Sequence, residues 1–480
     1  MLVVISDIHL CDGTATPRNV SADAFSLLYG DLHQLAVQYR AQSIDLVLLG
    51  DVIDLLRTER WFEDGAGRDV AASLRPWGSE AAVDNSGNAP ETLAHARLIA
   101  DEILAENEDA LRSLRRDGEE FPKPPCPVRR IYLPGNHDRL YLQDEQIRAN
   151  VRAALGAEDE RTLEAEGVQQ HALIMPRYGL IARHGHEWDI WNFGRYHEHA
   201  VPGDYSPADY LYTPIGDAIT TELVARLPFE LRRRLAETSA FRDTPELDAV
   251  YRRMQRIEDV RPLIASFRWA FYQGSSLHSS LVAPQAGALR RELQDTVRSL
   301  AADFKALPYY RAWRRTFHKP WHLDSAGKLE LVLDLLEHFD LDRVAWFVEQ
   351  FSGLVSRAEG DDVCLAGAAR EELRAVGSNG LRFVVYGHTH EPLQMPLHRE
   401  SVQDVYLNSG TWRQRQFFAT DRSGFVSWDL LTYLVFLDAR ETPDGSDRGN
   451  PAFLSWNGTR RVEPVPVVRS DVLPRAFPQV

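Results

Sequence analysis

Short apolar runs that end in polar side chains recur along this chain. The five clearest are LVVISD at the N-terminus, IDLVLLGD from Ile44 to Asp51, RRIYLPGN from Arg129 to Asn136, GLIARHGH from Gly179 to His186 and LRFVVYGHTH from Leu381 to His390. Their apolar cores are rich in Leu and β-branched residues and do not alternate with polar ones. This pattern predicts strands that are buried on both faces.

Helical periodicity separates the early runs. Apolar side chains in residues 22–40 are spaced three or four apart, at Phe25, Leu28, Leu32, Leu35 and Tyr39, and residues 92–116 show a similar pattern. Repeated strand–helix–strand order favours an α/β layered fold. In such folds a ligand binds beyond the carboxyl ends of the strands, which is where the polar residues of this chain cluster.

Two stretches interrupt this order and indicate insertions. Residues 58–91 bear Gly, Asp and Trp and are expected to be loop-rich, whereas residues 191–375 are mostly helical in pattern. We therefore expect an α/β core in two parts, residues 1–190 and 376–480, separated by a helical insertion or cap at residues 191–375. The runs DVYLNSGTW, FVSWDLLTYLVFLD and RRVEPVPVV are expected to be strands that complete a second sheet. The aromatic residues of the cap fit either its own core or a lid over a substrate pocket.

Composition and charge narrow the class of protein. The 480 residues carry a formal net charge of −16, which argues against a broad electrostatic surface for nucleic acid. Three scattered cysteines do not make a disulfide framework, and they fit a reducing compartment. The N-terminus enters an apolar run without a basic region, and apolar stretches such as residues 430–437 are too short to span a bilayer. We expect a cytoplasmic protein with no membrane span.

The residues at the strand ends share one kind of chemistry. They are Asp7 and His9, then Asp51 and Asp54, then Asn136, His137 and Asp138, then His184 and His186, and finally His388 and His390. Carboxylate, imidazole and amide groups offer the oxygen and nitrogen donors that suit Mn, Fe, Zn or Ni. One open metal site does not use so many donors, whereas two ions that share a carboxylate would use them, as in phosphate-ester hydrolysis.

The motifs DIH, GDVID, GNHD, HGH and GHTH, in this order, resemble the five motifs of the calcineurin-like metallophosphoesterases. The resemblance covers roughly residues 1–190 and 376–440 and leaves out the helical cap. It implies a four-layer αββα sandwich with a large inserted helical cap. It also implies a hydrolase that uses two divalent metal ions, with Mn²⁺ expected first and Fe, Zn or Ni as alternatives.

The same resemblance implies a role for each motif residue. One metal would be bound by Asp7, His9 and His390. The other metal would be bound by Asn136, His184 and His388, and Asp51 would bridge the two. His137 would protonate the leaving oxygen, Asp138 would orient His137, and Asp54 would support a metal ligand. His186 stays outside the expected ligand set.

The expected activity is hydrolysis of a small or medium phosphate ester by metal-activated hydroxide, with His137 as the general acid. One alternative is a lipid-precursor pyrophosphatase, because SDIHL and HGH resemble the UDP-2,3-diacylglucosamine hydrolases, although those typically carry Arg at the position of His137. A nuclease or cyclic-nucleotide phosphodiesterase is a second alternative, which the acidic charge disfavours. A non-catalytic scaffold is disfavoured because every ligand position is filled. The loop NSGTW at residues 408–412 fits either a plain turn or a loop of related phosphoesterases.

Overall fold

The computed structural model describes residues 1–18, 20–84, 87–117, 123–166, 168–197, 200–260, 269, 281–317, 325–338, 362–377, 380–398, 404–418, 425–443 and 452–461. The strands are β1 (Leu2–Ile5), β2 (Ile44–Leu49), β3 (Val128–Leu133), β4 (Leu173–Met175), β5 (Leu180–Ala182), β6 (Phe383–Tyr386), β7 (Leu393–Pro396), β8 (Val405–Asn408), β9 (Gln414–Phe418), β10 (Phe425–Leu437) and β11 (Ala452–Arg461). The helices are α1 (Ala22–Tyr39), α2 (Pro90–Glu106), α3 (Glu108–Arg115), α4 (Glu145–Leu155), α5 (Glu160–Ala165), α6 (Ile215–Ile219), α7 (Arg226–Glu237), α8 (Pro245–Met254), α10 (Ala283–Ala306), α11 (Pro308–Phe317), α12 (Ser325–His338) and α14 (Asp362–Val376). This content confirms the mixed α/β class.

Two mixed sheets form the centre of the fold. The first has the strand order β11-β10-β1-β2-β3, with β9 paired to β10, and the second has the order β4-β5-β6-β8-β7. Strands β1, β2 and β3 are parallel to one another, and so are β5, β6 and β8. Each of the five expected runs therefore supplies a strand of a parallel set, and its polar residues follow the carboxyl end of that strand.

The alternating faces of these strands bury different clusters. Leu2 and Val4 of β1 lie in one hydrophobic cluster with Leu180 and Val385 of the second sheet, so the two sheets pack face to face. Val3 and Ile5 point the other way, into a cluster with apolar residues of α1, α2, α3 and α4. Helix α14 packs on the second sheet, where Leu365 lies in a cluster with residues of β5, β6 and β8.

Several elements differ from the expectation. The periodic stretch 92–116 is two helices that meet at Asn107, whose amide donates to the carbonyl oxygens of Ile103 and Cys11. Strand β10 joins the first sheet beside β1, so the expectation that it completes a second sheet is wrong. Most of the run RRVEPVPVV lies outside the described residues, and β11 ends at Arg461.

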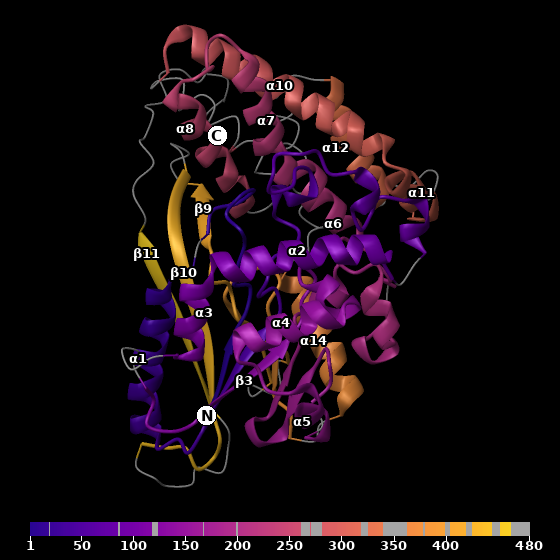
Figure 1. The fold of residues 1–480 in the computed structure, drawn as a ribbon. Helices are drawn as coiled ribbons and strands as arrows, with labels where there is room; N and C mark the ends of the chain where they lie inside the picture. The colour runs from indigo at the N-terminus through magenta and orange to yellow at the C-terminus, as the bar shows by residue number, and fades with distance from the viewer. Residues whose placement is uncertain are drawn as a thin grey trace, which may run out of the picture.

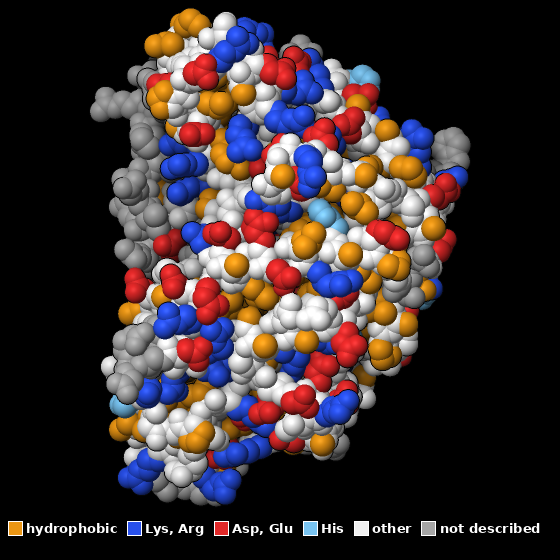
Figure 2. All heavy atoms as spheres, viewed as in Figure 1, with side chains coloured by type: hydrophobic (Ala, Val, Ile, Leu, Met, Phe, Trp, Pro, Cys, Tyr) orange, Lys and Arg blue, Asp and Glu red, His pale blue; other side chains and the backbone are white. Residues whose placement is uncertain are grey.

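The cap lies at the end of the molecule opposite the N-terminus, and β1 runs toward this end (Figure 1). The cap helices are α7, α8, α10, α11 and α12. Their core also takes in Trp77 and Val83 of the loop-rich stretch, so these two insertions share one hydrophobic cluster. Helix α14 falls within the stretch expected to be cap but packs on the second sheet instead. Among the described residues, no helix is long and apolar enough to cross a membrane. Acidic and basic side chains are interspersed over the face seen in Figure 2.

Candidate metal centre

Backbone strain concentrates where the strands end. Of the eight described non-glycine residues with positive φ, five are motif residues, namely Asp7, His9, Asp51, His388 and His390. A non-glycine residue in the left-handed region costs on the order of 1 kcal/mol or more, and such residues gather at sites where the strain serves a function. These five residues lie in the three turns after β1, β2 and β6, which therefore aim side chains in directions that an extended chain could not give them.

Two glycines let the backbones of neighbouring motifs approach. A Cβ atom at Gly135 would lie 2.2 Å from Oδ1 of Asp51 and 2.6 Å from its backbone nitrogen. A Cβ atom at Gly50 would lie 2.3 Å from Nδ1 of His184, and this residue also has φ near +80°. The residues GD and GN at the ends of β2 and β3 are thus packed directly against each other and against His184.

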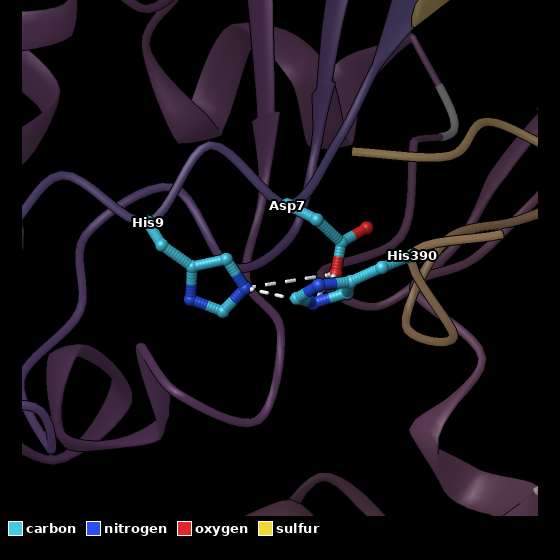
Figure 3. A group of neighbouring side chains, drawn as sticks. All are labelled: Asp7, His9 and His390. Carbon is cyan, nitrogen blue, oxygen red and sulfur yellow. Dashed lines mark hydrogen bonds and ion pairs between the residues drawn. The ribbon is translucent and has the colours of Figure 1, made fainter. Parts of the chain in front are cut away.

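Asp7, His9 and His390 form the first buried group (Figure 3). Nε2 of His390 lies 3.2 Å from Oδ1 of Asp7, and Nε2 of His9 lies 3.0 Å from Nε2 of His390. Oδ1 of Asp7 is buried and accepts no hydrogen bond from the described residues. Burial raises the pKa of Asp7 to about 6. An orphaned carboxylate oxygen that faces two imidazole nitrogens is a donor set that fits a cation.

Asp7, Asp51 and His184 form the second buried group. Nε2 of His184 lies 3.3 Å from Oδ2 of Asp51 and 3.1 Å from Oδ1 of Asn136, while its Nδ1 lies 3.0 Å from the carbonyl oxygen of Leu49. Burial lowers the pKa of His184, but the charge of Asp51 outweighs it and raises that pKa to about 10. A cation bound here has to displace a proton from the ring.

The carboxylate of Asp51 reaches toward both groups. Its Oδ2 lies 3.3 Å from Nε2 of His184 and 3.7 Å from Nε2 of His9. Its Oδ1 accepts a hydrogen bond from the backbone N–H of His137 at 2.9 Å, which fixes the plane of the carboxylate. Burial opposes ionisation of Asp51, but His184 and His137 hold its pKa well below the usual value. Asp51 is therefore a charged group placed between the two sets of donors.

His9, Asp54 and His137 form a third buried group, in which the side chain of His137 contacts Asp54 and not Asp138. Nδ1 of His137 lies 3.0 Å from Oδ1 of Asp54, and Nδ1 of His9 lies 3.0 Å from the other oxygen of the same carboxylate. Burial lowers the pKa of His137, but the charges of Asp54 and Asp51 outweigh it and raise that pKa above its usual value. Asp54 thus supports a residue of the first group, as expected, and orients His137 as well.

Asp138 has a different structural role from the one expected. Its carboxylate accepts hydrogen bonds from the backbone N–H groups of Asp51 and Val52, at 3.0 and 3.4 Å, and from the hydroxyl of Tyr132. Burial and the nearby charge of Asp51 raise the pKa of Asp138 to about 7. The expectation that Asp138 orients His137 is wrong, because the Asp138 side chain is engaged by the turn after β2.

His388 lies beside the second group but outside its closest contacts. Its ring centroid lies 5.4 Å from that of His184, and its backbone N–H donates to Oδ2 of Asp7 at 3.1 Å. Its Nε2 lies 3.0 Å from Oδ2 of Asp189, a buried carboxylate that the sequence motifs do not include. His186 is buried near His184 but is in none of the metal-compatible groups.

The loop at residues 408–412 forms hydrogen bonds with the backbone of two motifs, DIH at Asp7 and GHTH at Gly387. The hydroxyl of Thr411 and the backbone N–H of Trp412 donate to the carbonyl oxygen of Asp7, at 2.8 and 3.1 Å. The amide of Asn408 donates to the carbonyl oxygen of Gly387 at 2.8 Å. The loop is therefore part of the structure that holds Asp7, and more than a turn between strands.

One further cluster of possible ligands lies away from this centre. Asp334, Glu337 and His338 follow one another along α12, but Lys305 pairs with both carboxylates at 2.6 and 2.7 Å. A partly exposed cluster whose two carboxylates already pair with a lysine has the features of a surface ion-pair network. The groups around Asp7 and Asp51 differ from this cluster in being fully buried.

Comparison with known proteins assigns no family to this chain. No protein-family model matches the sequence, and no curated protein matches it. The site is therefore judged on its own geometry, in which three overlapping buried groups of Asp and His lie beside the amide of Asn136. These buried Asp and His groups can hold a metal ion.

Proposed function

We propose that this protein is a dinuclear metal-dependent phosphoesterase of the calcineurin-like type. The observation that carries the proposal is the position of Asp51, whose Oδ2 lies 3.3 Å from His184 on one side and 3.7 Å from His9 on the other. A carboxylate between two donor sets is the arrangement needed to bridge two ions about 3.5–4 Å apart. The ligand set proposed from the sequence motifs is kept, with Asn136 and His388 completing the second site.

The donors indicate which metals would bind. Both groups offer carboxylate oxygen and imidazole nitrogen, and neither contains a thiol. Such mixed nitrogen and oxygen sites suit borderline divalent ions, and we propose Mn²⁺ first, with Fe, Zn or Ni as alternatives. When bound, two such ions activate a water molecule for attack on phosphorus and offset the negative charge of the phosphate.

His137 is proposed as the general acid. Because its Nδ1 faces Asp54, its Nε2 is the nitrogen left for a substrate, and this atom lies 4.0 Å from Oδ2 of Asp51. Burial lowers the pKa of His137, but the charge of Asp54 outweighs it and raises that pKa, which favours an imidazolium whose Nε2–H can donate a proton to the leaving oxygen. Asp54 then stabilises the imidazolium before transfer and holds the ring in place.

The proposal includes the finer fold and the cellular setting. A four-layer αββα sandwich with an inserted cap is supported by three hydrophobic clusters, one between the sheets and one on the outer face of each. A small or medium phosphate ester is proposed as the substrate, because the cap helices lie over the end of the sheets where the site forms. A cytoplasmic location is proposed from the three scattered cysteines, which do not make a disulfide framework and fit a reducing compartment.

A pair of chromogenic esters tests the proposal. Protein freed of metal and then loaded with Mn²⁺ is assayed on 4-nitrophenyl phosphate and on bis(4-nitrophenyl) phosphate. We expect hydrolysis of at least one ester, abolished by chelator and by Asp51→Asn. Asp45→Asn is the matched control, since Asp45 pairs with Arg129 at the opposite end of β2. Absence of hydrolysis of both esters by protein that holds two ions would overturn the proposal.

A further inference from the structure

Asp189 is a buried carboxylate that faces the proposed ligand His388 and belongs to none of the metal-compatible groups. Its Oδ2 lies 3.0 Å from Nε2 of His388 and accepts a hydrogen bond from Nδ2 of Asn192 at 2.7 Å. Its Oδ1 accepts from the backbone N–H of Trp191 at 2.8 Å, which fixes the carboxylate at the start of the inserted segment. Asp189 is 5% exposed, so water does little to screen these contacts.

The contact with Asp189 decides which nitrogen of His388 can bind a metal. A carboxylate accepts, so Nε2 of His388 carries the proton and donates it to Asp189. In the neutral ring, Nδ1 then holds the lone pair. Imidazole ligands in metal sites commonly donate their second nitrogen to a carboxylate in this way, which fixes both tautomer and ring orientation. Asp189 therefore leaves Nδ1 of His388 as its ligating atom.

The same segment orients the amide of Asn136. Oδ1 of Asn192 accepts a hydrogen bond from Nδ2 of Asn136 at 3.4 Å, while Oδ1 of Asn136 lies 3.1 Å from Nε2 of His184. Asn136 therefore presents its oxygen, the metal-binding atom of an amide, to the second group. The backbone of the cap approaches Asn192 closely, because a Cβ atom at Gly216 would lie 2.4 Å from its Oδ1.

We propose that Asp189 and Asn192 are positioning residues of the second metal site, with Asp189 fixing His388 and Asn192 fixing Asn136. This inference rests on the proposed dinuclear function and adds to it a role for the inserted segment. The turn that leads into the helical cap supplies the outer contacts of one metal site, so that the cap and the second ion are linked. Among the residues that the structure describes, neither Asp189 nor Asn192 forms a hydrogen bond or ion pair with Asp7 or His9 of the first site.

Metal binding gives a test that does not depend on activity. Metal-free protein is titrated with Mn²⁺, and the free ion is counted by its electron paramagnetic resonance signal. We expect two ions per wild-type chain, and a 10- to 100-fold weaker second ion in Asp189→Ala, as for other outer partners of metal ligands. His388→Ala is expected to weaken the same ion, and the double variant to add little to either single one. Asp45→Asn serves as the control and is expected to bind like the wild type.

The outcomes separate this inference from the proposed function. If the wild type binds two ions and Asp189→Ala binds both equally well, or if the two substitutions are additive, the positioning role is overturned while the dinuclear site stands. If the wild type binds fewer than two ions, the dinuclear site and the positioning role fall together. If Asp189→Ala does not fold without metal, Asp189→Asn is tested instead, because it keeps the shape of the side chain and removes its charge. We expect this variant to bind the second Mn²⁺ ion at least about tenfold more weakly than the wild type.

Discussion

Replacing Asp54 by Asn removes one charge from a carboxylate that touches two histidines. Oδ1 of Asp54 lies 3.0 Å from Nδ1 of His137, and Oδ2 lies 3.0 Å from Nδ1 of His9. The amide oxygen of Asn can still accept the backbone hydrogen bonds that Leu56 and Arg57 donate to Oδ1 at 3.1 Å. The substitution therefore keeps the turn and removes the charge that favours the protonated form of His137.

The size of the effect follows from the distance. Two unit charges 3 Å apart interact by about 5 kcal/mol at an effective dielectric constant of about 20. Even a third of this energy exceeds the 1.4 kcal/mol that corresponds to a tenfold change in proton affinity. Because burial by itself lowers the pKa of His137, loss of Asp54 leaves only Asp51 to oppose that effect. General-acid catalysis is commonly worth about 100- to 10,000-fold in rate.

Leaving-group dependence is the assay that isolates this step. Phenyl phosphate releases a poor leaving group that needs a proton, whereas 4-nitrophenyl phosphate releases one that hardly does. For Asp54→Asn we expect kcat on phenyl phosphate to fall about 100-fold or more, and kcat on 4-nitrophenyl phosphate to fall much less. His137→Ala is expected to show the same asymmetry, and Mn²⁺ content is measured for each variant.

Two results would refute this reasoning. Equal losses on both esters, with Mn²⁺ content unchanged, would mean that Asp54 does not act through proton donation. A loss that follows only the Mn²⁺ content would mean that Asp54 acts through His9 alone. A smaller loss in Asp54→Asn than in His137→Ala is compatible with the reasoning, since Asp51 still faces the ring.

Three further predictions test the packing, pH dependence and metal content. Gly135→Ala places a Cβ atom 2.2 Å from Oδ1 of Asp51, so we expect about 1–3 kcal/mol of destabilisation by chemical unfolding and weaker Mn²⁺ binding; an unchanged Mn²⁺ affinity would contradict the close approach. Burial raises the pKa of Glu59 to about 7 from 4.5. The contribution of this carboxyl group to the free energy of unfolding is therefore fully present below pH 4.5 and is lost as the pH rises through 7. Glu59→Gln should therefore gain on the wild type by up to about 1.4 kcal/mol per pH unit in that window, and parallel stability curves would refute this. At a free Mn²⁺ concentration of about 100 times the dissociation constant, bound Mn²⁺ should raise the free energy of unfolding of the wild type by about 2.7 kcal/mol. Removing Mn²⁺ should abolish this gain in the wild type and leave the free energy of unfolding of Asp51→Asn unchanged.

Local sequence was informative about elements and about the kinds of donor. The spacing of apolar residues predicted α1 almost to its ends, because a 3.6-residue period reports which face is buried. Continuous apolar runs predicted β1, β2, β3, β5 and β6 for a similar reason. The polar residues that follow those strands include the members of both buried groups around Asp7 and Asp51.

Partners between distant segments were decided by the tertiary structure. Strand β10 read as an apolar strand from its residues, but nothing local indicated that it pairs with β1. Likewise Asp138 is the neighbour of His137 in sequence, yet its side chain accepts hydrogen bonds from the backbone after β2. The carboxylate that contacts the His137 ring belongs to Asp54 instead. Adjacent side chains point in different directions, so nearness along the chain does not predict contact in space.

No sequence pattern predicted the residues that contact the metal-ligand side chains from outside. Asp189 and Asn192 lie in an aromatic stretch, DIWNF, that carries no metal-binding spacing, and Thr411 lies in a run of common turn formers. Their roles arise because the two sheets pack face to face and bring the ends of β1, β2, β3, β5, β6 and β8 to one place. The residues alone showed which strands end in ligand-type side chains, since strands buried on both faces form continuous apolar runs. Only the packing of the two sheets decided which of those residues meet, because contact depends on strand order and on the direction of each turn.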